Sequence, residues 1–220
     1  MINVVVKVGG SLSRGTNLRA LCLLLAQLGC EHRILVVPGG GPFADTVRDC
    51  DKMYGLSDDA SHWMAILAMD QYGYLLLELI PGSEPARERH EARRIALSGK
   101  VPVLIPFELL RRTDPLPHSW AVTSDSISAW VARSVGASKL ILLKSLDGLS
   151  DGVFSPGALE GESYRPVTLE QLARWEGVDP YLAAVLANEG PELWIIDGNM
   201  PDRFRELLAK GTTPGLCLQR

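Results

Sequence analysis

A lysine and two glycines stand out in an apolar run near the start of the chain. Lys7 is the one charge within Val4–Val8, and Gly9, Gly10 and Ser11 follow at once. A cation among β-branched residues is costly to bury unless an anion meets it, and glycine lets backbone N–H groups approach a ligand closely. A helix that began soon afterwards would add a partial positive charge. The pattern predicts a phosphate-binding loop after a strand; the alternative is a tight turn whose lysine reaches solvent.

A second glycine stretch repeats this arrangement. A buried strand is expected over Arg33–Val37, Gly39, Gly40 and Gly41 follow Pro38, and a helix is expected from about Phe43. Ligands of open α/β sheets bind beyond the carboxyl ends of the strands, so both glycine stretches are expected to line one site. Neither matches the Walker or dinucleotide-binding pattern, which indicates another kind of phosphate site.

Two further stretches carry charged groups that suit this site. Asp125 follows Thr123 and Ser124 at the start of a helical pattern, where a carboxylate either caps the helix or holds a lysine in place facing phosphate. Another apolar strand, expected over Lys139–Leu143, is followed directly by Lys144.

The elements that must position these residues alternate between strand and helix. A long helix capped by Ser57 is expected to run through Asp70 to about Leu79. Its His62 is more simply interpreted as a packed residue than a catalytic one, and Asp70 needs a partner if it is buried. We also expect helices over 18–29 (ended by Gly29), in the Arg-rich stretch after 85, from Thr168, over 180–188 and over 202–210; strands over 101–106, 193–197 and 215–218; and a turn over 80–85. This order predicts one α/β domain, with an open, mostly parallel sheet between helices.

Composition narrows the class of protein. The chain has 220 residues, 46% hydrophobic and 22% charged, with a net charge of −4. No basic run is interleaved with aromatic residues, which argues against nucleic acid as a partner. Charges or prolines break the apolar stretches well short of a membrane span, and the four cysteines lack the spacing of a zinc or redox site. We therefore expect a soluble, cytoplasmic protein with reduced thiols.

These motifs resemble the amino acid kinase family, which includes acetylglutamate, uridylate and isopentenyl phosphate kinases. The resemblance lies in Lys7–Ser11, Pro38–Gly41, Thr123–Asp125 and Leu143–Leu149, which occur in the family's order. It implies a three-layer α/β/α fold, with the acceptor over roughly residues 1–120 and the nucleotide over roughly 121–220.

The same resemblance implies ATP-dependent phosphoryl transfer. Lys7 would contact the transferring group, Asp125 would orient the lysines, and Mg²⁺ would bind mainly nucleotide oxygens and water, with no protein metal site. The residues expected to contact phosphate or nucleotide are Gly9, Gly10, Ser11, Gly39, Gly40, Gly41, Ser124, Asp147 and Gly148.

Two positions depart from the family pattern. Many relatives carry a Gly-Met-x-x-Lys segment whose lysine reaches the γ-phosphate, whereas Gly177–Leu182 contains no lysine here. Lys144 stands where many relatives have Thr or Asp. We hypothesise that Lys144 supplies the missing charge, so the predicted catalytic set is Lys7, Asp125 and Lys144.

Within the family, four segments look like a short branch that acts in methanofuran synthesis: Ala60–Ala65, Met69–Tyr72, Leu116–Trp120 and Ala129–Ala132. This likeness implies that the acceptor is [5-(aminomethyl)furan-3-yl]methyl phosphate and the product its diphosphate. The cationic aminomethyl group would favour acidic or aromatic contacts, and the candidates for the acceptor site are His62, Trp63, Asp70 and Trp120.

Two alternatives remain open. In the first, the chain is a kinase of the same family whose acceptor is uridylate, isopentenyl phosphate or a carboxylate. In the second, the chain is a non-catalytic protein that binds a nucleotide or another anion. Family members are commonly oligomeric, and the apolar helix around Trp63 is the expected interface of a homo-oligomer.

Overall fold

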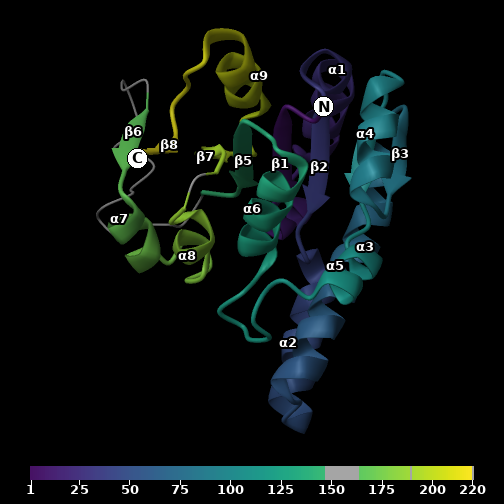
Figure 1. Cartoon of the computed structure of the whole chain (residues 1–220), viewed down its shortest axis with the longest axis vertical. Helices are drawn as coiled ribbons and strands as arrows, with labels where there is room; N and C mark the ends of the chain where they lie inside the picture. The colour runs from purple at the N-terminus through teal and green to yellow at the C-terminus, as the bar shows by residue number, and fades with distance from the viewer. Residues whose placement is uncertain (147–163, 189, 220) are drawn as a thin grey trace.

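The computed structural model describes residues 1–146, 164–188 and 190–219, and its core is an eight-stranded sheet (Figure 1). The strand order is β3-β4-β2-β1-β5-β7-β8-β6. All pairs are parallel except β7 with β8, which is antiparallel. Helices cover both faces, so the predicted class, a mostly parallel sheet between helices, is confirmed.

The first half of the chain builds one side of the sheet, and Figure 1 shows α2 extending beyond the end of β2. Its elements are β1 (Val4–Val8), a 3₁₀ helix η1 (Gly10–Arg14), α1 (Leu18–His32), β2 (Ile34–Pro38), α2 (Gly41–Tyr54), α3 (Asp58–Leu79), β3 (Ser83–Ala86), α4 (Arg89–Leu97), β4 (Val101–Leu104) and α5 (Phe107–Thr113).

The second half contributes the other side. Its described elements are α6 (Ser124–Val135), β5 (Lys139–Lys144), β6 (Arg165–Val167), α7 (Leu169–Arg174), α8 (Leu182–Leu186), β7 (Glu192–Asp197), α9 (Pro201–Lys210) and β8 (Leu216–Leu218). Among the residues that the structure describes, no helix combines the length and apolar character needed to cross a membrane.

Alternate residues of the central strands enter two separate cores. Val4, Val6 and Val8 of β1 pack with α1, α9 and the second half of α3, whereas Val5 packs with α4, α6 and the first half of α3. This alternation follows from the two-residue period of a strand. Both faces of β1 are therefore buried, as expected of a Val-rich central strand in a parallel sheet.

Local signals placed several elements correctly. Ser57 caps α3, where its side chain accepts a hydrogen bond from Ala60 N, and α3 ends at Leu79 as predicted. Thr168 caps α7 in a capping box with Gln171.

Two expectations about elements were wrong, and one helix was not predicted. Gly29 does not end α1, which continues to His32 and ends at Arg33 in the left-handed conformation, φ 49°. A Cβ on Gly29 would lie 2.2 Å from Val101 Cγ2, so this glycine serves helix–sheet packing. The expected turn over 80–85 contains the edge strand β3, and the helix α5 was not expected from the sequence.

Candidate active site

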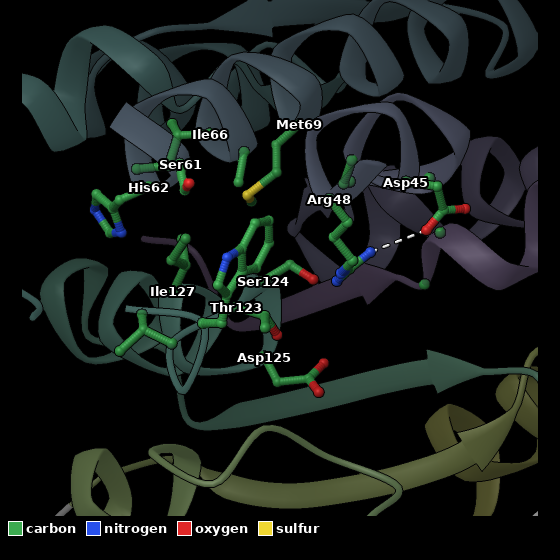
Figure 2. Close-up of a pocket in the computed structure, with 18 of the residues that line it drawn as sticks. Asp45, Arg48, Ser61, His62, Ile66, Met69, Thr123, Ser124, Asp125 and Ile127 are labelled. Carbon is green, nitrogen blue, oxygen red and sulfur yellow. Dashed lines mark hydrogen bonds and ion pairs between the residues drawn. The ribbon is translucent and has the colours of Figure 1, made fainter. Parts of the chain in front are cut away.

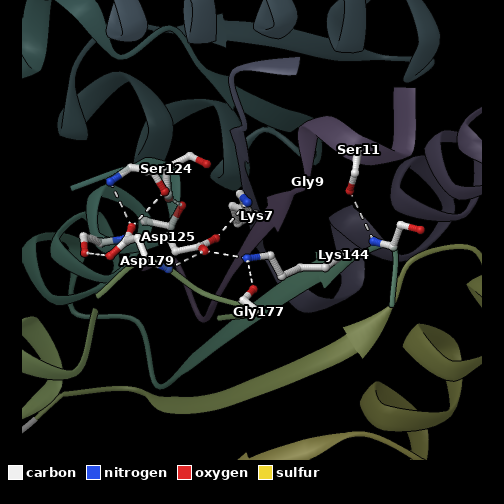
Figure 3. Close-up of polar contacts among 12 residues, drawn as sticks. Lys7, Gly9, Ser11, Ser124, Asp125, Lys144, Gly177 and Asp179 are labelled. Carbon is white, nitrogen blue, oxygen red and sulfur yellow. Dashed lines mark hydrogen bonds and ion pairs between the residues drawn. The ribbon is translucent and has the colours of Figure 1, made fainter. Parts of the chain in front are cut away.

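A buried carboxylate pairs with two lysines at the carboxyl edge of the sheet (Figure 3). Asp125 Oδ1 lies 2.8 Å from Lys7 Nζ, and Asp125 Oδ2 lies 2.5 Å from Lys144 Nζ. The side chains of Asp125 and Lys7 are 3% and 5% exposed. Two ammonium groups against one carboxylate leave a local excess of positive charge, which attracts an anion.

Strand register explains why the lysines converge. Lys7 lies two residues after Val5 on β1 and pairs with Leu142 of the neighbouring β5, and Lys144 lies two residues after Leu142. Because side chains alternate between the faces of a sheet, both lysines point to the face that α6 covers. Asp125, in the first turn of α6, completes the arrangement.

The charges in this cluster depend on one another. Burial by itself would raise the pKa of Asp125, but the ion pairs with Lys144 and Lys7 hold this pKa well below its usual range. Burial lowers the pKa of Lys7, and the attraction of Asp125 offsets only part of that effect. A second anion beside Lys7 would therefore favour its charged form.

The loop that lacks the family lysine supports this cluster in another way. Asp179 accepts hydrogen bonds of 2.9 Å from Thr123 N, Thr123 Oγ1 and Ser126 N, and another from Ser126 Oγ. Its own N–H donates to Asp125 Oδ2, and Lys144 Nζ donates to the Gly177 carbonyl at 2.6 Å. The loop thus fixes the start of α6 and the Lys144 side chain, a role that the sequence alone did not suggest.

The two glycine stretches pack directly against each other. A Cβ on Gly10 would lie 2.3 Å from Gly41 N, and one on Gly39 would lie 2.7 Å from Gly10 N. Any side chain would force these backbones apart, so glycine is required for the close approach. The structure confirms that the two stretches meet at one edge of the sheet.

The amides of these glycines are not equally available. Gly9 N donates to Leu143 O and Gly39 N donates to Val8 O, so two of the expected phosphate contacts are already engaged within the sheet. Gly40 and Gly41 open α2, where the first N–H groups of a helix have no acceptor within the helix. Gly10 begins η1, and the first α-helix after it starts only at Leu18.

A cavity of about 370 Å³ opens beside the lysines (Figure 2). This volume falls in the range of small-molecule sites. Ala65, Ile66, Met69, Val122 and Ile127 give it apolar walls. The charged or polar groups that line it are Lys7, Gly9, Gly10, Ser11, Arg14, Gly40, Gly41, Asp45, Arg48, Asp58, Ser61, His62, Ser119, Trp120, Thr123, Ser124, Asp125 and Lys144.

Of the four predicted acceptor residues, His62 and Trp120 line this cavity and the other two do not. Trp63 is buried against Phe107 and His118, and its indole N–H donates to Asp59. Asp70 accepts a hydrogen bond from Phe107 N at the start of α5, and burial raises its pKa to about 6. Asp70 has the partner that its burial requires, but that partner is a helix terminus.

Other cavity residues had no signal in the sequence. Arg14 and Arg48 approach the two oxygens of Asp45 at 2.6 and 2.9 Å, and all three side chains line the cavity. Arg48 lies one helical turn after Ala44, at the i+4 spacing that puts both on the cavity side of α2. Arg14 and Arg48 could be recognised as cavity residues only once the packing of α2 beside η1 was known.

Two predicted nucleotide residues, Asp147 and Gly148, lie outside the described residues. Ser11 Oγ accepts a hydrogen bond from Ser145 N, and Ser124 lies on the cavity wall. Within residues 1–146, 164–188 and 190–219, no three His, Cys, Asp or Glu side chains gather as ligands for a metal ion.

Comparisons with known proteins find relatives that span nearly the whole chain. The chain is 30% identical over 207 residues to [5-(aminomethyl)furan-3-yl]methyl phosphate kinase from Methanocaldococcus jannaschii, which covers 93% of this chain and 92% of the relative. It is 25% identical to uridylate kinase from Methanoculleus marisnigri, over 98% of this chain and 94% of that protein.

Solved structures show the same fold at low identity. Uridylate kinase from Archaeoglobus fulgidus superposes with a TM-score of 0.72 at 18% identity, over 99% of this chain and 100% of that one. Isopentenyl phosphate kinase from T. acidophilum gives 0.61 at 17% identity, with the same shares. Residues 3–156 match the sequence profile of the amino acid kinase family. The chain therefore belongs to the amino acid kinase family and is a kinase.

Proposed function

We propose that the chain transfers the γ-phosphoryl group of ATP, with Mg²⁺, to the phosphate of [5-(aminomethyl)furan-3-yl]methyl phosphate, giving the diphosphate and ADP. The observation that carries the proposal is the Lys7–Asp125–Lys144 cluster at the wall of a cavity that also contains Gly10, Gly40 and Gly41. The acceptor is taken from the Methanocaldococcus jannaschii relative.

MgATP supplies the phosphoryl group: a bond forms between an oxygen of the acceptor phosphate and the γ-phosphorus, and the bond from that phosphorus to the β–γ bridging oxygen breaks. An ionised phosphate oxygen is already a nucleophile, so no residue has to remove a proton. Such a transition state depends on position and charge neutralisation. Lys7 and Lys144 provide two positive charges, and Asp125 holds both ammonium groups in place.

The walls of the cavity suit a small ring that carries a phosphate. Gly40 and Gly41 present helix-start amides, and Arg14 and Arg48 add positive charge on the same side, which favours an anionic acceptor group. Ile66 and Met69 offer an apolar surface against which a furan ring can pack, and Trp120 adds an aromatic one. We assign His62 and Trp120 to the acceptor site and leave out Trp63 and Asp70.

ADP release tests the proposal. The chain is incubated with Mg²⁺ and ATP together with the furan phosphate, uridylate, isopentenyl phosphate or acetylglutamate, and Lys7→Ala is the control. We expect turnover with the furan phosphate and its loss in Lys7→Ala. Turnover with another acceptor alone would overturn the assigned substrate, whereas bound ATP without any turnover would indicate a nucleotide-binding protein.

A further inference from the structure

One hydroxyl in the cavity wall has no hydrogen-bond partner. Ser61 is 3% exposed, and its Oγ contacts no donor or acceptor among the described residues. A buried group that is left unsatisfied destabilises the fold, so buried hydroxyls are normally bonded. Ser126 and Ser128, which are buried in α6, both have partners. Ser61 therefore stands out as a group that a ligand would satisfy.

The position of Ser61 gives a ligand access to it. Figure 2 shows Ser61 and His62 on α3 at one side of the cavity, with Arg48 and Asp45 at the other. The serine hydroxyl can turn between staggered positions about Cα–Cβ. A ligand anchored at the arginine side can thus reach Ser61 across the apolar middle of the cavity.

A carboxylate lies beside this hydroxyl. Asp58 also lines the cavity, and it lies three residues before Ser61, so the two occupy adjacent turns of one helix face. Its neighbour Asp59 is engaged with His118, whereas no cation of the described residues pairs with Asp58. Asp58 and Asp59, both in the first turn, also offset the positive end of the helix dipole.

The chemistry of the pair selects its ligand. An ionised carboxylate only accepts hydrogen bonds, and a hydroxyl can also accept, so together they suit a donor. The adjacent His62 adds no opposing charge, because burial, aided by His118, lowers its pKa and favours the neutral ring. We propose that Asp58 and Ser61 form a subsite for a protonated amine at the end of the acceptor opposite its phosphate, an inference that rests on the proposed function.

The two ends of the cavity then match a zwitterionic acceptor. Lys7, Arg14 and Arg48 face its phosphate end, and Asp58 and Ser61 face its amine end. A purely hydrocarbon tail, such as an isopentenyl group, would leave the buried Ser61 hydroxyl unsatisfied and would offer the exposed Asp58 no cation. Discrimination of this kind is large when a site built for a polar group receives an analogue that lacks it.

Calorimetric binding tests the subsite without relying on turnover. The two probes are [5-(aminomethyl)furan-3-yl]methyl phosphate and the analogue with a methyl group in place of the aminomethyl group. We expect the wild-type chain to bind the amine about tenfold more tightly or better, since hydrogen bonds to charged groups contribute about 1.5–3 kcal/mol. Ser61→Ala and Asp58→Asn should each lose most of that preference, and the Asp58 effect should shrink in high salt.

The matched control is Ser134→Ala, which removes a hydroxyl bonded within α6 to Val131 O. It should keep the wild-type preference. Equal wild-type affinity for both probes, or an unchanged preference in Ser61→Ala and Asp58→Asn, would overturn the subsite. ADP release is measured separately, so a chain that prefers the amine but does not phosphorylate it would overturn the proposed function and support the subsite.

Discussion

At the scale of single residues, Lys144 is the second lysine of the buried charge cluster. It stands at the end of β5, and Gly177–Leu182, where the family resemblance implies a lysine, contains none. The structure gives Lys144 two anchors, Asp125 Oδ2 and the Gly177 carbonyl. One of these anchors lies in the very loop that lacks the lysine. Lys144, at the end of β5, thus brings a second ammonium group to the carboxylate that Lys7 of β1 also contacts.

Lys144→Ala is therefore expected to lower kcat by about 100-fold or more, the usual effect of removing one preorganised donor from a charged transition state. ADP release under saturating substrate measures it. Lys139→Ala is the matched control, because Lys139 begins the same strand and pairs with Glu192 away from the cavity. Full turnover in Lys144→Ala would show that this cation does not replace the family lysine.

At the scale of elements, the start of α6 is held by a residue from a distant loop. Thr123 is the N-cap residue, but its side chain makes no cap of its own, and Asp179 accepts hydrogen bonds from Thr123 and Ser126 in its place. This carboxylate also lies behind Asp125, whose charge adds to burial in raising the pKa of Asp179. The orientation of the Asp125 carboxylate thus depends on the loop.

We expect Asp179→Ala to lower the free energy of unfolding by about 2–3 kcal/mol, because it leaves several buried donors without an acceptor. Urea unfolding at neutral pH measures this. Asp202→Ala, which removes an exposed carboxylate from the first turn of α9, should change stability little. If both variants unfolded at the wild-type midpoint, Asp179 would not be the support of α6.

A histidine joins the loop before α6 to the start of α3. His118 Nδ1 lies 2.8 Å from Asp59 Oδ1, and His118 Nε2 lies 2.8 Å from Asp114 Oδ1. Hydrogen bonds to Asp114, and next to Asp59, raise the pKa of His118 above its usual range despite some burial. The protonated ring can donate to both carboxylates, so protonation strengthens the link beside the cavity.

The sign of the pH effect follows from this raised pKa. The stabilisation by His118 is fully present below the unfolded-state pKa and is lost as the pH rises through the higher folded-state pKa. We expect His118→Gln to lose more stability at about pH 5.5 than at about pH 8.5. Urea unfolding at both pH values measures the difference. Because the charge of His118 helps burial to lower the pKa of His62, both proteins carry His62→Gln in this comparison, which removes that coupling. A pH-independent difference would contradict the assigned charge.

At the scale of the whole molecule, the strands, glycine stretches and helix caps that depend on only a few neighbouring residues could be predicted from the sequence. The Val-rich strand with Lys7, the glycine stretch at Gly39 and the caps at Ser57 and Thr168 are all local signals. The alternation of such elements determines the mostly parallel sheet, and a parallel sheet brings strand ends to one edge. The meeting of Lys7 with Asp125 could be predicted for that reason.

Features that arise from contacts between distant segments could not be predicted. Gly29 is the residue expected to end a helix, yet packing against Val101 keeps it inside α1. Asp179 lies 54 residues from Asp125 in the sequence, and no local sequence pattern predicts their contact. Trp63 and Asp70 lie on the right helix, but Asp59 and Phe107 engage them away from the cavity.

The surface of α3 argues that the chain assembles with itself. This helix is apolar around most of its circumference, and Leu67, Tyr74 and Leu75 are 41%, 52% and 37% exposed. Tyr74 and Leu75 follow Leu67 by seven and eight residues, which places all three on one face of the helix. An isologous contact between two copies of the chain would bury this face on both of them. We predict a homodimer, or a larger assembly built from it, through α3.

Sedimentation velocity at micromolar protein concentration measures the oligomeric state of the chain. The double variant Leu67→Glu with Leu75→Glu should sediment as a monomer and keep its fold, because both side chains already contact solvent. Leu97→Glu, which changes a leucine that is 64% exposed on α4, should leave the assembly intact. A wild-type chain that stays monomeric at tens of micromolar would contradict the prediction. Since α3 also carries Ser61 and Asp58, a dimer that loses activity on dissociation would connect the interface to the acceptor end of the cavity.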